Sequence, residues 1–354
     1  MSHMADPVTS RPNVLNSLSS DRKDSSLYQY GSKNSLVRTA GRFVRTPSTR
    51  AGLVALLVFA FFAAAAKGFL SVEAAKSYLT LASESGVLAL GVTLLMIGGE
   101  FDLSVGSVLG LSALLVPLLV LHGVYPAIAI IIGLAAGALI GALHGVLVAM
   151  TKAPSLIVTL GGLMFWRGIV FALTGGFLVP VDTHSAVFRI FSASWAGFQV
   201  SLLWLAALVL LLELTLARTR FGNWVFATGG NPGTAVQLGI PVRRVKIILF
   251  MLTAMLAALA GMIQMTRFAS VEPLRGQGAE LRAITAVVIG GTRLEGGRGT
   301  VLGTAFGVLT IAMIKVGLQL IRVPGYFLDA TVGAVLVLAV LVNVYTGRIA
   351  RASS

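Results

Sequence analysis

The chain contains no cysteine, and only 11% of its 354 residues are charged. The absence of cysteine excludes disulfide bridges and metal sites built on thiolates. The charged share is about half that of a typical soluble domain. Hydrophobic residues make up 56% of the chain, and several apolar runs reach the roughly 20 residues that span a bilayer as a helix. These runs are longer and more uniformly apolar than the strands of an outer-membrane barrel. The sequence therefore predicts an all-α, polytopic membrane protein.

A long apolar run is also missing from the N-terminal region. Residues 1–46 are rich in Ser, Asn, Arg and Asp, and no apolar stretch of the kind found in a secretory signal precedes Gly52. A segment with so few apolar residues does not bury enough surface to fold. We expect residues 1–46 to form a disordered cytoplasmic tail, residues 47–350 the transmembrane domain, and residues 351–354 a short C-terminal tail.

The apolar runs predict ten membrane segments. The eighth is too short to cross a bilayer as a regular helix, so we expect a half-helix continued by non-helical backbone. Such backbone is tolerated at membrane depth only where it is buried in protein or lines a cavity. The ten predicted segments are 50–68, 80–97, 104–121, 125–149, 155–174, 201–217, 247–266, 282–292, 299–318 and 328–346.

The net charge of +14 has two interpretations. In a soluble protein it would indicate a nucleic-acid partner, whereas in a membrane protein Lys and Arg gather on the cytoplasmic side. With the N-terminus inside the cell, the cytoplasmic segments carry 18 Lys and Arg and the outer segments carry 7, although 8 of the 18 precede or open the first membrane segment. We expect no nucleic-acid partner, and both termini in the cytoplasm.

One phrase occurs twice. Ile97–Gly110 reads IGGEFDLSVGSVLG, and Ile289–Gly303 reads IGGTRLEGGRGTVLG, with one extra residue in the second copy. The shared ending Val-Leu-Gly recurs after 193 residues, and this offset divides the chain into two related halves at about 50–149 and 246–346. Glycine-interrupted hydrophobic segments at matching places in two halves are typical of a transport path.

The segment between the sixth and seventh predicted spans is long and basic. Residues 218–246 read RTRFGNWVFATGGNPGTAVQLGIPVRRVK, with a Gly-Asn-Pro-Gly turn followed by a short predicted helix at Thr234–Leu238. The segment is either an ordinary connector or a docking surface for a soluble partner, since long structured loops are often functional.

Three stretches together resemble the permease subunits of ribose-type sugar importers of the ATP-binding-cassette class. They are Gly98–Ala113, Phe221–Lys246 and Ala260–Gly303, they occur in the order found in that family, and the similarity covers roughly residues 50–346. The sequence departs from the family pattern at Pro232–Thr234, where relatives are richer in Ala. It departs again at Arg282, where many relatives carry an acidic residue.

The resemblance implies an inner-membrane permease that pairs with a second copy or a close relative to form the path. It also implies a separate cytoplasmic ATPase and a periplasmic sugar-binding protein as partners. The permease itself would be non-catalytic and would need no cofactor, and no Lys-containing phosphate loop is present. By the same resemblance, the residues of the ATPase-coupling loop are Gly229, Gly230, Asn231, Ala235, Gly239 and Ile240.

Several residues are candidates for a translocation path or gate. Asp102 and Ser104 either cap the third span or form a gate at a broken helix, and the two roles are compatible. Gly290 and Gly291 lie in the second copy of the phrase, where glycine permits a tight turn, a path element or close helix packing.

The fifth span carries a second group of candidates, Phe165, Trp166 and Arg167. Aromatic rings stack on the C–H faces of sugars and a guanidinium donates to hydroxyls, but interior packing explains the same residues. Intramembrane ionisable groups are functional candidates by default, which adds His144, Glu213 and Lys315. Glu213 has a simpler explanation as an ion pair with Arg218 or Arg220.

Two other classes of protein are weighed against the importer. An ion-coupled secondary transporter needs acidic or His relays at mid-membrane, and Glu213 lies near a predicted membrane edge. An intramembrane enzyme needs convergent catalytic groups, and no His/Glu pair or Ser/His spacing predicts one. His144 has no second His or carboxylate four residues away, so we expect no metal site.

Overall fold

The computed structural model describes residues 46–352, so the predicted N-terminal tail lies outside the described residues apart from Thr46. Each of the ten predicted membrane segments corresponds to one apolar helix in this described part. These helices are α2 (Pro47–Ala65), α3 (Val72–Ile97), α4 (Val105–Leu121), α5 (Pro126–Thr151), α6 (Ser155–Thr174), α8 (Ser201–Arg218), α11 (Val242–Phe268), α12 (Ala279–Ile289), α13 (Val301–Leu320) and α14 (Phe327–Ala352).

Helix length separates full spans from partial ones. Seven of these helices are long and apolar enough to cross a membrane. α12 has 11 residues, and at 1.5 Å per residue it extends only about 16 Å, so the prediction of a short eighth segment is confirmed. α14 runs to Ala352, so the first two residues of the expected C-terminal tail are helical.

Short elements connect the spans. α7 (Ala186–Ser192) precedes α8, and α9 (Arg220–Gly230) and α10 (Pro232–Gln237) lie between α8 and α11. β1 (Val179–Pro180) pairs antiparallel with β4 (Ser270–Val271), with Val179 opposite Val271. β2 (Ser194–Trp195) and β3 (Phe198–Gln199) form a second antiparallel pair. The described part of the chain is therefore a helical bundle with two minimal strand pairs.

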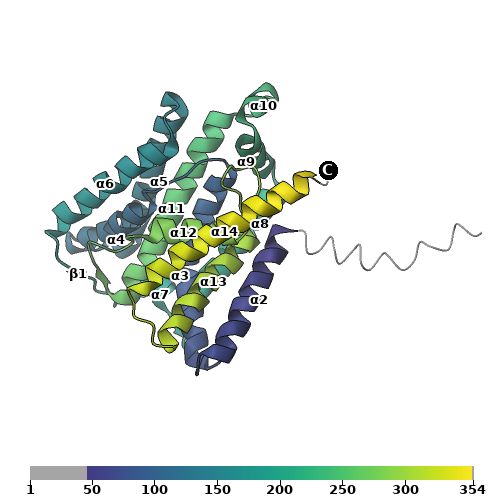
Figure 1. Ribbon diagram of the computed structural model, residues 1–354. Helices are drawn as coiled ribbons and strands as arrows, with labels where there is room; N and C mark the ends of the chain where they lie inside the picture. Colours follow the sequence, from purple (N-terminus) through teal and green to yellow (C-terminus); the bar gives the residue numbers. More distant parts are fainter. Residues whose placement is uncertain (1–45, 353–354) are drawn as a thin grey trace, which may run out of the picture. The chain divides into compact units, whose positions relative to one another are not determined.

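α11 lies at the centre of the bundle, packed against α3, α4 and α5 (Figure 1). α5 meets it with glycine at every fourth position, which places all four on one helix face. A side chain at Gly141 would start 2.3 Å from the carbonyl oxygen of Phe250. The stripe lets the two helices approach until their backbones touch, as small residues do in membrane bundles. Its members are Gly133, Gly137, Gly141 and Gly145.

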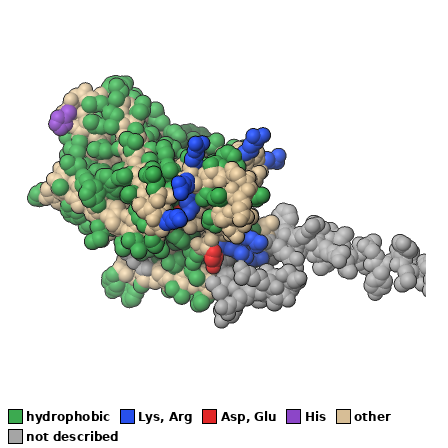
Figure 2. Space-filling model, turned by 90° about the horizontal axis from the view of Figure 1, so that it is seen from above, with side chains coloured by type: hydrophobic (Ala, Val, Ile, Leu, Met, Phe, Trp, Pro, Cys, Tyr) green, Lys and Arg blue, Asp and Glu red, His purple; other side chains and the backbone are tan. Residues whose placement is uncertain are grey.

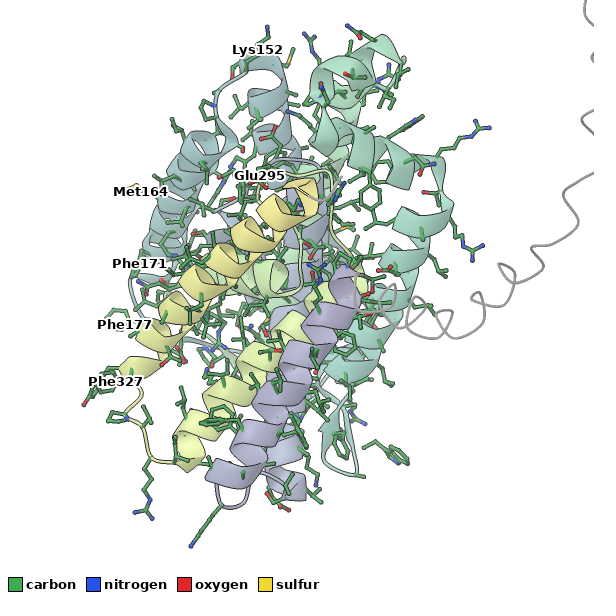
Figure 3. All side chains as sticks on the ribbon, turned by 45° about the vertical axis from the view of Figure 1, so that its right-hand side comes forward. Lys152, Met164, Phe171, Phe177, Glu295 and Phe327 are labelled. Carbon is green, nitrogen blue, oxygen red and sulfur yellow. The ribbon has the colours of Figure 1, made fainter. Side chains whose placement is uncertain are left out.

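The two sequence halves pack across each other. α2, from the first half, packs against α13 of the second, and α11 of the second half packs against α4 of the first (Figure 1). Nearly every residue of α3 from Ala82 to Ile97 is buried, whereas α6 exposes most of its apolar side chains. Met164 and Phe171 of α6, and Phe177 just after its end, point away from the bundle (Figure 3). An apolar outer surface around a packed interior suits a protein surrounded by lipid.

Candidate functional site

Both glycine-rich phrases end a helix with the same backbone turn. α3 and α12 each stop at an isoleucine, and the second glycine that follows is left-handed, with φ of 82° at Gly99 and 86° at Gly291. The next amide, that of Glu100 or of Thr292, donates to the carbonyl five residues earlier in its helix. This is the hydrogen bond of a Schellman cap, in which only glycine takes the left-handed place without strain. We call the two interruptions the first break (98–104) and the second break (290–300).

Side chains of α6 satisfy the backbone of the first break. The Phe101 amide donates to Ser155 Oγ at 3.2 Å, and the Leu103 amide donates to Thr159 Oγ1 at 3.1 Å. An unpaired amide inside a membrane costs several kcal/mol, on the order of a lost hydrogen bond in an apolar medium. These two hydroxyls therefore allow non-helical backbone at this depth.

Four side chains form a hydrogen-bonded network behind the first break, of which three are buried and the fourth, Trp166, is half-buried. Asp102 Oδ1 accepts from the Ser104 amide at 2.8 Å and from Ser104 Oγ at 2.6 Å. Ser104 Oγ lies 3.2 Å from His144 Nδ1, and Trp166 Nε1 donates to His144 Nε2 at 3.2 Å. Gly162 makes room for the ring, since a Cβ there would lie 2.5 Å from His144 Nε2. This hydrogen-bonded network connects the first break to both α5 and α6.

The direction of these hydrogen bonds follows from the indole. Trp166 Nε1–H only donates, so His144 Nε2 accepts, and the neutral ring carries its proton on Nδ1. Nδ1–H then donates to Ser104, whose hydroxyl donates to Asp102. A histidine in this state does not take a proton from Ser104 through Nδ1. The fold does bring a Ser and a His together, which sequence spacing did not indicate, but in an arrangement that anchors the break rather than one that activates a nucleophile.

Asp102 differs from the expected helix cap in one detail. Its carboxylate binds the amide of Ser104, the residue just before α4, rather than an amide of the first helical turn. The Ser104 side chain does not cap α4 either. The carboxylate is 1% exposed, and among the described residues its second oxygen, Oδ2, has no hydrogen-bond partner.

The second break is capped by a different set of groups. The Thr300 hydroxyl accepts from the third amide of α13, and Glu213 Oε2 accepts from the first two, at 2.9 and 3.1 Å. A carboxylate at a helix N-terminus also interacts favourably with the helix dipole. The expectation that Glu213 pairs with Arg218 or Arg220 is wrong: no such pair is present among the described residues.

Gly290 and Gly291 pack closely where α12, α13 and α2 meet. A Cβ at Gly290 would lie 2.7 Å from the carbonyl carbon of Gly303, and one at Gly291 would lie 2.9 Å from Pro47 Cβ. Gly290 is buried and Gly291 is half-buried. Of the interpretations weighed for these glycines, the geometry favours turn formation and close packing.

The predicted coupling loop is a helical hairpin. α9 and α10 are separated by Asn231, whose side-chain oxygen accepts from the Thr234 amide at 3.1 Å and caps α10. The helix therefore begins at Pro232, two residues before its predicted start, because proline suits the first helical turn. Ala235 is buried, and its carbonyl accepts from the Ile240 amide after a left-handed turn at Gly239.

The tip of this α9–α10 hairpin exposes apolar side chains. Val236 is 60% exposed and Leu238 is 74% exposed. Arg243 and Arg244, also exposed, follow directly at the start of α11. Figure 2 looks onto this end of the molecule and shows Lys and Arg side chains gathered there. An apolar tip beside basic residues is suited to bind a soluble protein with an acidic rim.

Five glycines bring the hairpin and both breaks together. A Cβ at Gly229 would lie 1.8 Å from the carbonyl oxygen of Ile97, and the amide of Gly297 donates to that same oxygen at 2.8 Å. We call this contact the glycine junction; its members are Gly99, Gly229, Gly230, Gly296 and Gly297. The two copies of the repeated phrase, distant in sequence, thus meet on the end of α9.

The candidates in α6 do not share one environment. Arg167 donates to the carbonyls of Pro273 and Arg275, at 2.9 and 2.8 Å, and so holds the segment between β4 and α12. Phe165 is 60% exposed on the outer side of α6, while its ring meets that of Trp166 edge to face at 4.8 Å. Of these three residues, only Trp166 belongs to the hydrogen-bonded network behind the first break.

Two partly buried ion pairs were not predicted from the sequence. Glu100, in the first break, pairs with Lys246 of α11, and Glu84 in α3 pairs with Arg267 at the end of α11. The sequence carried a signal for the second pair, because Glu84 is the one charged residue of the predicted span 80–97 and such a carboxylate needs a partner. No group of His, Cys, Asp or Glu suited to hold a metal is found within residues 46–352.

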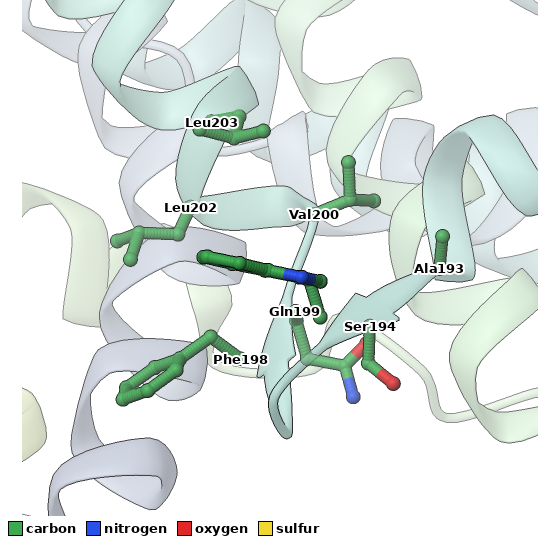
Figure 4. A pocket seen from close by; sticks show the side chains of 8 residues that line it. Ala193, Ser194, Phe198, Gln199, Val200, Leu202 and Leu203 are labelled. Atoms are coloured by element: carbon green, nitrogen blue, oxygen red, sulfur yellow. The ribbon is translucent and has the colours of Figure 1, made fainter.

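A pocket at the start of α8 lies apart from these residues (Figure 4). Its lining is almost wholly apolar apart from one hydroxyl, one amide and one indole N–H, so it offers few groups that bind a hydroxyl-rich solute. The lining residues are Ala193, Ser194, Trp195, Phe198, Gln199, Val200, Leu202 and Leu203.

Residues 74–341 match the model of the family described as branched-chain amino acid transport system / permease component. The ribose import permease protein RbsC of Escherichia coli K12 is 35% identical over 297 residues, covering 82% of this chain and 92% of that protein. RbsC of Bacillus subtilis is 37% identical over 260 residues, covering 73% and 81%. The autoinducer 2 import system permease protein LsrC of Salmonella typhi is 33% identical over 309 residues, covering 87% and 88%. No solved structure matches the chain.

Proposed function

Because this chain belongs to the family of transport-system permease components, we propose that it imports a monosaccharide or related polyol across the bacterial inner membrane. The observation that carries the substrate class is the 35% identity to a ribose import permease over 92% of that protein. A second relative is named for autoinducer 2 rather than for an amino acid. A neutral, hydroxyl-rich solute also suits a bundle whose interior polar groups are mostly hydroxyls.

The proposal includes three partners. A cytoplasmic ATPase of the ATP-binding-cassette class supplies the energy, a periplasmic binding protein delivers the solute, and a second permease copy or a paralogue completes the path. The permease itself is non-catalytic. The long apolar face of α6 offers a surface for the second permease, since it is exposed in the single chain (Figure 3).

The ATPase docks on the α9–α10 hairpin, which places both termini of the permease in the cytoplasm. Support comes from the exposed apolar pair Val236 and Leu238, set beside Arg243 and Arg244. The same end of the molecule carries many of the basic residues, as the positive-inside rule requires of a cytoplasmic face (Figure 2).

Reconstitution tests the substrate and the energy source. The permease is placed in proteoliposomes with its ATPase and binding protein, and uptake of labelled ribose, other monosaccharides and leucine is measured with and without ATP. We expect ATP-dependent uptake of a sugar. Uptake of leucine instead would overturn the substrate class, and ATP-independent uptake driven by an ion gradient would favour a secondary transporter.

Charge substitution tests the docking surface. Val236→Asp and Leu238→Asp place a carboxylate at the exposed tip, where no packing is disturbed, and are expected to weaken ATPase co-purification about tenfold or more. The matched control is Leu70→Asp, since Leu70 is 68% exposed and precedes α3, at the far end of that helix from the hairpin. Unchanged ATPase binding in both hairpin variants would exclude docking at this tip.

A further inference from the structure

The glycine junction joins three segments through backbone atoms alone. The carbonyl of Ile97, at the end of α3, lies against Gly229 on one side and accepts the Gly297 amide on the other. A Cβ added at Gly297 would lie 2.6 Å from Gly230 Cα, and one at Gly296 would lie 2.7 Å from Gly99 Cα. No flexible side chain lies between the segments, so a displacement of one is transmitted directly to the others.

A second contact ties the first break to the other end of the hairpin region. Glu100 follows the junction directly, and it forms an ion pair with Lys246, four residues after the start of α11. Both side chains are largely buried, at 11% and 21% exposure. An ion pair with so little water around it is costly to break on one side only, since the remaining charge is left without a partner. The first break is therefore in contact with α9, which precedes α10, through Gly229, and with α11, which follows α10, through Lys246.

We infer that Gly229 and Lys246 are positioning residues that couple the hairpin to both breaks, so that one movement of the hairpin shifts the two breaks together. This inference rests on the proposed docking of the ATPase at the hairpin. The two breaks are non-helical, so they do not move as rigid helices do. They lead directly into α4 and α13. A rigid contact between discrete elements is the arrangement by which a local shift becomes a larger rearrangement.

The alternative is that the glycines serve helix packing only. The two roles differ in what fails. A packing defect lowers stability and assembly, and reduces ATP hydrolysis and uptake in proportion. A coupling defect leaves an assembled complex that hydrolyses ATP but moves less solute for each ATP. The ratio of uptake to ATP hydrolysis therefore separates the two.

A pair of glycine variants provides the test and its control. Gly229→Ala places a methyl group 1.8 Å from a backbone oxygen, whereas Gly333→Ala, in α14 and outside the hairpin and both breaks, meets nothing within 4 Å. Both are tested as the full complex in proteoliposomes with ATPase and binding protein. We expect Gly229→Ala to assemble, to hydrolyse ATP, and to lose about tenfold in uptake per ATP, within the usual range of allosteric coupling. Gly333→Ala is expected to match the wild type.

The ion pair gives an independent measurement should Gly229→Ala fail to assemble. Glu100→Gln and Lys246→Gln each remove one charge, and we expect each single variant to lower uptake per ATP. The loss in the double variant should be smaller than the sum of the two single losses, as a coupled pair requires. An unchanged ratio of uptake to hydrolysis in Gly229→Ala, or additive losses in the charge cycle, would overturn the inference. Failure of the docking proposal is recognised separately, because the ATPase would then bind Val236→Asp and Leu238→Asp normally.

Discussion

The first and second breaks start from the same turn and are then held by different means. In both, a glycine in the right-handed region is followed by a left-handed glycine, Gly99 or Gly291, and by the same hydrogen bond back into the helix. Beyond this point the first break is anchored by side chains, through Asp102 and Ser104. The second is anchored by backbone contact and by the carboxylate of Glu213.

The difference explains why the two following helices begin at different places. The Asp102 carboxylate orders the residues before α4, so that helix begins at Val105. The residue equivalent to Ser104 in the second copy is Gly297, whose φ of 69° is incompatible with a helix. α13 therefore begins only at Val301. The shared phrase determines where α3 and α12 end, while a few other residues determine where the following helix begins.

The largest effect is expected from substitution of Gly303, which is equivalent to Gly110 in the first copy of the phrase. A Cβ at Gly303 would lie 2.1 Å from the carbonyl oxygen of Gly290, whereas one at Gly110 would lie 3.0 Å from that of Arg275. Overpacking of this kind costs about 1–3 kcal/mol or more, since neither backbone can yield. We expect Gly303→Ala to lower the melting temperature in detergent far more than Gly110→Ala. Equal losses would show that the second break depends no more on backbone contact than the first.

Removal of Asp102 is expected to have the next largest effect. Asp102→Ala leaves the Ser104 amide and hydroxyl buried without their acceptor, which costs about 1–3 kcal/mol for each unsatisfied group. Asp102→Asn keeps an acceptor oxygen in the same place and serves as the control. Thermal unfolding of the purified protein should rank wild type first, then Asn, then Ala. A result in which Asn is as harmful as Ala would point to the charge rather than to the hydrogen bonds.

Glu213 offers the corresponding experiment for the second break. Glu213→Ala removes the acceptor of the first two amides of α13, and because this site is half-buried we expect a loss of about 1–2 kcal/mol. Glu213→Gln, which keeps the acceptor but not the charge, should lose less. Hydrogen exchange at residues 301–303 measures the effect locally. Unaltered exchange there in Glu213→Ala would contradict the capping role.

Trp166→Phe is expected to have the smallest effect. The substitution keeps an aromatic ring against Phe165 but removes the indole donor to His144, a loss of about 1 kcal/mol. Without that donor the proton on the ring is free to move to Nε2, so the nitrogen-15 shifts of His144 should report a change of tautomer. The same shifts in the variant and in the wild type would show that the indole does not determine the tautomer.

The membrane architecture was predictable because it depends on averages over many residues. Long apolar runs determine α2, α5 and α11 whatever their neighbours do, and the shortness of the eighth run correctly predicted α12. The repeated phrase likewise located both breaks, since consecutive glycines end a helix for local reasons.

The contacts that hold the breaks were not predictable in the same way. Ser104 and His144 are 40 residues apart, and Glu213 and Val301 are 88 apart, so their pairing depends on how helices pack. Glu213 was expected to pair with nearby arginines because a sequence alone shows only which residues are close along the chain. The start of α10 was misjudged by two residues because the capping role of Asn231 was not recognised.

The glycine stripe of α5 has a consequence for how the protein is made. α5 leaves the ribosome about a hundred residues before α11, which fills the groove formed by Gly133, Gly137, Gly141 and Gly145. Membrane helices insert individually before they associate, so this face must remain against lipid until α11 arrives. Synthesis halted before residue 242 would thus leave four or more inserted helices without their common centre.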